Sequence, residues 1–259
     1  MSFMQGQRVV LITGVAGGIG QATAVRFHES GWFVIGVDRK ADQNLPGVDR
    51  YIQADAALPG EIRAALRVAS QIAVGEGENG RLDALVNNAA IQVTKPMMEM
   101  SLEEWDDIMN VNVRSAFVFT QAAHDLLKAS SGSIVNVSSV HAVATSADIA
   151  AYAASKGALL ALTRALAVEL AADDIRVNAI LPGAVDTPML RAGLNRGHVS
   201  GTVEEKIRAL AAKTVIGRVG DTDEIARCIL FLADNSQSSF MTGQALIVDG
   251  GATARLSTE

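Results

Sequence analysis

Tyr152 and Lys156 have the residue types and the spacing for proton-transfer chemistry. They begin and end the segment Tyr-Ala-Ala-Ser-Lys, which places both side chains on one face of a helix. A phenol has an ordinary pKa near 10, so it needs help to act as a base at neutral pH. An adjacent ammonium stabilises phenolate, and lowering the pKa by about three units corresponds to roughly 4 kcal/mol. The pair predicts a tyrosine general acid/base, although this spacing alone is most often structural.

Ser139 strengthens that prediction. It precedes Tyr152 and follows an expected strand over Ser133–Val137. Ligands bind beyond the carboxyl ends of strands in open α/β sheets, so the Ser139 hydroxyl could hydrogen-bond a substrate oxygen beside the tyrosine. Ser138 is a rival, because a hydroxyl at the end of a strand would suit either serine. The sequence leaves this choice open.

A glycine-rich turn predicts a second kind of chemistry, the binding of a dinucleotide. The run Thr-Gly-Val-Ala-Gly-Gly-Ile-Gly occupies positions 13–20, where a first strand passes into a first helix. A diphosphate needs backbone N–H groups at a helix N-terminus, and only glycine permits close approach without a clashing Cβ. A tight turn alone would use the same residues, but this position favours the functional interpretation. The expected cofactor contacts are Gly14, Gly17, Gly18, Ile19 and Gly20.

Asp38 predicts which dinucleotide binds. It ends the second expected strand, where a carboxylate can accept both hydrogen bonds of the adenosine ribose diol. It would also repel a 2′-phosphate by a few kcal/mol at about 4 Å. Arg39 follows at once and could soften that repulsion. We predict NAD as the cofactor, with an NADP-dependent ketoreductase as the alternative.

The elements that must position these residues alternate along the chain. Short apolar runs predict strands, and longer Ala-rich segments between them predict helices. Strands of near-continuous apolar content separated by helices indicate a parallel sheet covered on both faces. Right-handed crossovers make such a sheet doubly wound. We therefore predict a single α/β domain of Rossmann type over residues 1–259. Expected strands are 9–12, 33–37, 51–54, 83–87, 133–137, 176–181 and 245–248, and expected helices are 18–30, 58–74, 101–128, 152–171 and 223–232.

Residues 188–214 fit this alternation poorly. The segment carries three glycines and mixed charges between the sixth strand and the next clear helix. A long insertion of this kind is often a lid over a binding site, and a surface excursion is the alternative. Arg191, Arg196 and His198 lie on it and could close over an acidic or hydroxylated substrate. Each could equally be a solvated surface residue.

The composition excludes several classes of function. The chain is 49% apolar and 19% charged, as globular proteins are, and a net charge of -6 without a dense basic run argues against nucleic acid. One cysteine, Cys228, and four histidines cannot assemble a zinc or iron–sulfur site, so we predict no metal. The most apolar stretch, 149–172, is interrupted by Lys156, Arg164 and Glu169, which predicts no membrane span and a cytoplasmic protein.

Taken together, these motifs resemble the short-chain dehydrogenase/reductase family, and the match runs from about Arg8 to Ala252. Ala90 stands where the family usually has glycine, and Ala56 where a larger apolar residue is common. Neither departure touches the reacting residues. Besides the motifs above, the resemblance rests on Asn87–Ala90, Asn112, Arg176–Asn178, Pro182–Pro188, Thr242–Gln244 and Val248–Gly251.

The resemblance implies a catalytic tetrad of Asn112, Ser139, Tyr152 and Lys156. Tyr152 would be the general acid/base and Ser139 would orient the substrate oxygen. Lys156 would lower the pKa of the phenol and hydrogen-bond the nicotinamide ribose, and Asn112 would support a water-linked proton path to Lys156. The cofactor contacts it implies are Asp55 near the adenine, Asn88 beside the adenosine ribose, Val185 and Thr187 by the carboxamide, together with Ala89, Pro182 and Gly183.

Gln92 and His141 bear on the substrate. The pair is similar to the one that 3-hydroxybutyrate dehydrogenases use to hold a carboxylate, and Ser-Val-His at 139–141 resembles glucose dehydrogenases. We expect a small sugar, polyol or hydroxy acid, bound by Gln92, Ser139, His141, Tyr152 and Arg191. A dinucleotide-sensing protein without turnover is the non-enzymatic alternative. The family also implies a homotetramer, joined through the helices expected at 101–128 and 152–171.

Overall fold

The protein is built around one parallel sheet. The computed structural model describes residues 6–41, 44–72, 80–196 and 200–254. The strand order is β3-β2-β1-β4-β5-β6-β7, so the chain builds outward in both directions from β1 and β4. A crevice for a ligand forms at such a reversal of strand order. The predicted doubly wound α/β fold is confirmed. The strands are β1 (Val9–Thr13), β2 (Phe33–Asp38), β3 (Arg50–Gln53), β4 (Ala84–Asn87), β5 (Ser133–Val137), β6 (Arg176–Pro182) and β7 (Ala245–Val248).

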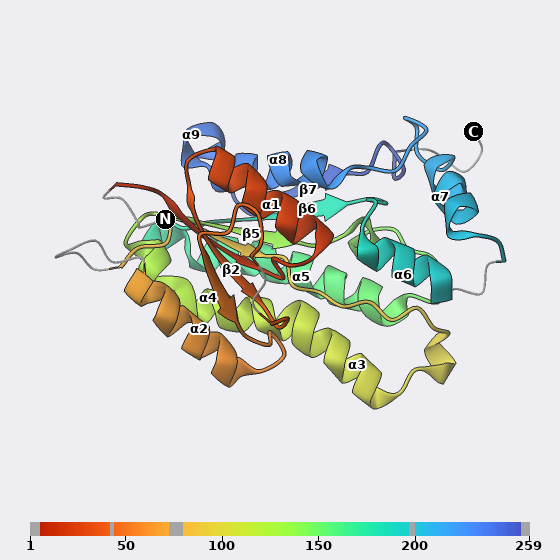
Figure 1. The fold of residues 1–259 in the computed structure, drawn as a ribbon, viewed down its shortest axis with the longest axis horizontal. Helices are drawn as coiled ribbons and strands as arrows, with labels where there is room; N and C mark the ends of the chain where they lie inside the picture. The colour runs from red at the N-terminus through yellow and green to blue at the C-terminus, as the bar shows by residue number, and fades with distance from the viewer. Residues whose placement is uncertain (1–5, 42–43, 73–79, 197–199, 255–259) are drawn as a thin grey trace.

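Helices cover both faces of the sheet, as Figure 1 shows. On one face α1 packs against α8, and on the other α2 lies beside α4, with α5 completing that layer. The helices are α1 (Gly18–Glu29), α2 (Pro59–Ile72), α3 (Leu102–Met109), α4 (Ser115–Lys128), α5 (Ala150–Glu169), α6 (Pro188–Arg196), α7 (Val203–Ala211), α8 (Thr222–Ala233) and α9 (Asn235–Ser238).

Two apolar layers hold the helices onto the sheet. Successive strand side chains point to opposite faces, so Val9 and Leu11 of β1 join the layer under α2, α4 and α5. Val10 and Ile12 join the layer under α1 and α8. The side chains of β1 are buried on both faces of the sheet. This burial explains why residues 9–12 are all apolar and do not alternate with polar residues.

A single long helix was expected over residues 101–128, but the structure has two helices there. These helices, α3 and α4, are joined by a five-residue π-helix, η2 (Asn110–Arg114). A π turn is wider than an α turn and is common at functional sites. Here it carries Asn112, which is 1% exposed and turned toward the loop after β4 and toward α5.

The segment 188–214 contains two helices at one end of the molecule (Figure 1). A capping box of Thr202 and Glu205 starts α7. Lys206 of α7 connects the two helices, because its ammonium donates a hydrogen bond to the carbonyl of Leu194 in α6 at 2.7 Å. No helix in the described ranges is long and apolar enough to cross a membrane.

Candidate active site

One cavity of about 570 Å³ brings the predicted cofactor residues and reacting residues together. It lies beyond the carboxyl ends of the strands, between the glycine turn after β1 and residues from α5, α6 and the end of α7. The predicted residues that line it are Gly14, Gly17, Gly18, Ile19, Gly20, Asp38, Asp55, Asn88, Ala89, Gln92, Ser139, His141, Tyr152, Lys156, Pro182, Gly183, Val185 and Thr187.

The glycine turn is held open by close packing behind it. Gly14 has φ +65°, and a Cβ there would lie 2.8 Å from the Cα of Ala89. A Cβ on Gly20 would overlap the carbonyl oxygen of Gly14. The Asn88 side-chain amide donates to the carbonyls of Thr13 and Gly14, at 2.9 and 3.1 Å. The Asn88 amide group therefore shapes the turn.

The turn fits the diphosphate and ribose of a dinucleotide. No side chain caps the N-terminus of α1, and its first turn holds no acidic residue, so its backbone N–H groups face the cavity unneutralised. Asp38 sits across the turn, and its carboxylate accepts a hydrogen bond from the Ala16 N–H at 3.0 Å. Its other oxygen accepts from the backbone of Lys40 at 3.1 Å. An anion-binding turn and a carboxylate at the end of β2 thus border the same space.

Ser139 is the serine that faces the reacting tyrosine. A hydrogen bond between Ser139 and Tyr152 opposes the effect of burial on the phenol pKa. The Ser139 oxygen also accepts from the His141 N–H at 3.2 Å. Ser138 also borders the cavity, but its hydroxyl already donates to the carbonyl of Lys156 at 2.9 Å. The choice that the sequence left open is decided by which way β5 directs each side chain.

Burial shifts the pKa of both reacting groups in the protein by itself, and the expected effect of Lys156 on the phenol stays a prediction. Burial raises the pKa of Tyr152 to about 12, and burial lowers the pKa of Lys156 to about 7. The ammonium lies 5.5 Å from the centre of the Tyr152 ring and donates to the carbonyl of Val137 at 2.8 Å. Removal of the groups from water is the main cause of both shifts.

Asn112 stands behind the cavity and does not line it. Its amide donates to the Ile91 carbonyl at 2.9 Å and to the Ser155 hydroxyl at 3.0 Å, and its carbonyl accepts from the Ile91 N–H at 2.8 Å. The Ser155 hydroxyl in turn donates to the carbonyl of Tyr152 at 2.7 Å. The side chain therefore positions α5 and the loop after β4. The water-linked path to Lys156 stays a prediction.

His141 and Gln92 border the substrate end of the cavity. The His141 ring packs edge-on against the Tyr152 ring, with centroids 5.9 Å apart, and its Nδ1 lies 3.1 Å from the Thr145 hydroxyl. Burial lowers the pKa of His141, so the ring is neutral near pH 7. The Gln92 amide donates to the Thr94 hydroxyl at 3.2 Å. Both side chains can offer hydrogen bonds to a polar substrate.

The prediction that Arg191 binds substrate is contradicted. Its guanidinium is bidentate to Asp186, at 2.7 and 2.8 Å, and lies 3.6 Å from Glu204. Arg191 does not line the cavity, because this pairing turns its side chain to the outside of α6. His198 and the Arg196 side chain lie outside the described residues.

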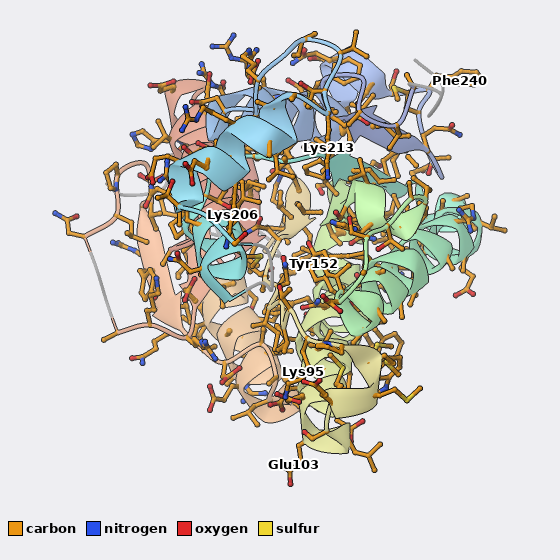
Figure 2. The ribbon with its side chains drawn as sticks, turned by 90° about the vertical axis from the view of Figure 1, so that its right-hand side faces the viewer. Lys95, Glu103, Tyr152, Lys206, Lys213 and Phe240 are labelled. Carbon is orange, nitrogen blue, oxygen red and sulfur yellow. The ribbon has the colours of Figure 1, made fainter. Side chains whose placement is uncertain are left out.

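Sequence reasoning missed several cavity residues near the reacting end. The loop after β5 contributes Thr145 and Ser146, α6 contributes Met189, and the end of α7 contributes Leu210 and Lys213. Figure 2 shows Lys213 above Tyr152 on the same face of the molecule. The one available signal was that three of these positions fall in the segment 188–214.

Comparison with known proteins agrees with this geometry. Residues 14–253 match the family described as "Enoyl-(Acyl carrier protein) reductase". The chain is 37% identical over 253 residues to the 3-oxoacyl-[acyl-carrier-protein] reductase FabG of Thermotoga maritima, covering 94% of this chain and 97% of that one. It is 44% identical over 178 residues to the cyclopentanol dehydrogenase of Comamonas testosteroni, covering 68% of each.

A solved structure extends the likeness to the whole fold. The aldohexose dehydrogenase of Thermoplasma acidophilum superposes with a TM-score of 0.88 at 32% identity, over 97% of this chain and 96% of that one. The sequence similarity, the fold and the residues that line the cavity all point to the same family. The chain belongs to the short-chain dehydrogenase/reductase family of oxidoreductases, which act on small molecules with a nicotinamide dinucleotide.

Proposed function

We propose that the protein is an NAD-dependent alcohol dehydrogenase that interconverts a small polar alcohol and its ketone. The observation that carries the proposal is that Ser139, Tyr152 and Lys156 share one cavity with the glycine turn and Asp38. An alcohol held by Ser139 and Tyr152 would lie beside the space where a nicotinamide ring fits.

In this mechanism the dinucleotide would supply the hydride chemistry, and side chains of the protein would transfer the proton. The Tyr152 oxygen accepts the hydroxyl proton during oxidation and returns it during reduction. Ser139 hydrogen-bonds the substrate oxygen and keeps it within reach of the phenol. Lys156 hydrogen-bonds the nicotinamide ribose, and its charge favours phenolate once the site is filled.

Asp38 supports NAD as the cofactor, because its carboxylate borders the turn where the adenosine ribose would lie. A specific observation favours NADP as the second candidate, since Arg39 and Lys40 also line this end of the cavity. Comparing kcat/KM for the two cofactors decides between them. Asp38→Ala should lower the preference for NAD over NADP at least tenfold. An NADP preference in the unaltered protein would reverse the assignment.

Polar side chains at the substrate end, which lie among apolar ones such as Met189, Leu190 and Leu210, support a sugar, a polyol or a hydroxy acid. The side chains there include Gln92, His141, Thr145 and Ser146, and the only phenyl or indole ring among the described lining residues is that of Tyr152. Cofactor reduction should be measured across a panel of sugars, polyols, hydroxy acids and apolar cyclic alcohols. Turnover of bulky apolar alcohols alone would contradict this substrate class. Tight NAD binding without turnover of any alcohol would support the dinucleotide-sensing alternative.

We further propose a homotetramer, in keeping with the family. Phe117 on α4 and Val168 on α5 are 47% and 79% exposed, on the helices expected to join the subunits. Large apolar side chains left in water often mark a protein interface.

A further inference from the structure

Lys213 brings to the cavity a charged side chain that the mechanism above does not use. It follows the last turn of α7, and it lines the cavity together with Leu210 and Thr214. Within the described part of the chain, its ammonium makes no hydrogen bond or ion pair. Figure 2 shows it above Tyr152, on the face where the cavity lies.

The backbone that carries Lys213 is firmly held. Its N–H donates to the Leu210 carbonyl at 3.0 Å. The next residue, Thr214, is buried, and its hydroxyl lies 2.8 Å from the carbonyl of Ala211 and 3.0 Å from that of Arg218. The Thr214 oxygen also accepts from the Arg218 N–H at 3.1 Å. A fixed attachment point with a flexible four-carbon stem suits a group that reaches for a ligand.

The distribution of charge in the cavity is uneven. The lining carboxylates among the described residues are Asp38 and Asp55, both at the β2–β3 side, where the adenosine would lie. The reacting end, formed by residues after β5 and β6 and on α5–α7, has no lining carboxylate among the described residues.

The acids that flank this end are already engaged elsewhere. Asp186 pairs with Arg191, Glu205 caps α7, and Asp249 accepts hydrogen bonds from the backbone and hydroxyl of Thr253. None of them neutralises Lys213.

We propose that Lys213 binds a carboxylate on the substrate, so that the protein acts on hydroxy acids and their oxo acids in preference to neutral sugars and polyols. The inference rests on the proposed dehydrogenase function and narrows its substrate. A carboxylate suits the site better than a phosphate, because a carboxylate carries one negative charge for this one lysine, whereas a phosphate monoester carries about 1.5 to 2 at pH 7. Arg191, the nearby arginine of α6, is occupied by Asp186.

The neutral groups of the site would complete the binding of such a substrate. His141 is neutral near pH 7 and, like Gln92, can hydrogen-bond a carboxylate but not balance its charge. Lys156 is committed to the Val137 carbonyl and to the ribose in the proposed mechanism. Lys213 is therefore the cation left for the substrate among the described residues at this end.

The experiment compares matched charged and neutral alcohols. The panel pairs 3-hydroxybutyrate and longer hydroxy acids, with the carboxylate one to four carbons from the carbinol, with their methyl esters. At least one acid should exceed its ester in kcat/KM about tenfold or more, as expected for a hydrogen bond to a charged group. Lys213→Gln should remove most of that preference through the KM of the acid, and Lys213→Arg should retain it. Added salt should lower kcat/KM for the acid and leave kcat/KM for the ester unchanged.

Arg208→Gln is the matched control, because Arg208 is an exposed cation of α7 that does not line the cavity. It should leave the acid-to-ester ratio unchanged. The proposal would be overturned if every ester or neutral alcohol were preferred over its acid, or if Lys213→Gln left the acid-to-ester ratio of kcat/KM unchanged. Either outcome would leave the proposed dehydrogenase function intact. If Lys213→Gln raised the KM for NAD with both the acid and the ester, Lys213 would bind the cofactor, and the proposal would also be overturned. No turnover of any alcohol would refute the proposed function itself.

Discussion

At the scale of single residues, burial dominates the chemistry of the site. Tyr152 and Lys156 are 8% and 2% exposed, and the pKa values of both move toward the neutral form, to about 12 and about 7. The lysine is held through its ammonium and the tyrosine through Ser139. The two groups are thus positioned before a cofactor arrives.

Removing the Tyr152 hydroxyl should abolish most turnover. General acid/base groups contribute about 10²–10⁴-fold, so Tyr152→Phe should lower kcat by that factor. The Kd for NADH, measured by fluorescence titration, should stay within about twofold, because the variant keeps the ring and the glycine turn. Unchanged turnover in Tyr152→Phe would refute the assigned role.

Lys156 should make the stability of the ligand-free protein depend on pH. Between pH 7 and 10.5 the unfolded chain keeps a lysine proton that the folded chain has lost, so the folded state gains stability as the pH rises through this range. A pKa difference of about 3.5 corresponds to at most about 5 kcal/mol. Urea unfolding at several pH values should show this rise in the unaltered protein relative to Lys156→Met. Parallel profiles for the two proteins would contradict the lowered pKa.

At the scale of elements, close backbone approaches shape the site. The turn before α1 depends on two glycines whose missing Cβ atoms make room for Ala89 and for the turn's own carbonyl. The π-helix between α3 and α4 turns Asn112 inward, where it ties the loop after β4 to α5. In both places a local irregularity sets the position of cavity residues.

Two helical glycines provide a matched test of that packing. Gly20→Ala should lower the free energy of unfolding by about 1–3 kcal/mol, since its Cβ would overlap the Gly14 carbonyl and lie 2.7 Å from the Asn88 amide nitrogen. Gly60→Ala, in α2 with nothing near its Cβ, should raise that energy by up to about 1 kcal/mol. Denaturant titrations measure both. Equal effects would mean that the turn relaxes around the added methyl.

At the scale of the whole molecule, side-chain hydrogen bonds fix the sheet to its helices at the start of β6. Arg176 is 8% exposed, and its guanidinium donates to Asn235 at 2.7 Å and to the carbonyls of Leu232 and Met241 at 3.0 and 3.1 Å. These bonds join β6, α8 and the approach to β7. Arg176 begins β6, so these bonds fix the end of the strand opposite the cavity, and α6 and α7 form the outer wall of the cavity itself.

The proposed tetramer is tested at this scale. Light scattering should give four times the 27.1 kDa of one chain, and Phe117→Asp should dissociate it by burying a charge in the interface. Val68→Asp is the control, because Val68 is similarly exposed, at 43%, on α2, outside the proposed interface. A monomer at micromolar concentration would contradict the tetramer.

The sequence alone determined the order of the strands and of α1, α2, α5 and α8, the glycine turn and the spacing of Ser139, Tyr152 and Lys156. These features depend on local periodicity, on backbone freedom at glycine and on the i,i+4 geometry of one helix, so neighbouring residues reveal them. The boundaries of these strands and helices follow for the same reason, whereas α6, α7 and α9 were not predicted.

Only the tertiary structure decided between Ser138 and Ser139, removed Arg191 from the cavity and brought Lys213 to it. It also showed that burial raises the pKa of Tyr152. Each of these outcomes depends on burial and on partners from other elements, because a side chain's direction and desolvation are set by what packs around it.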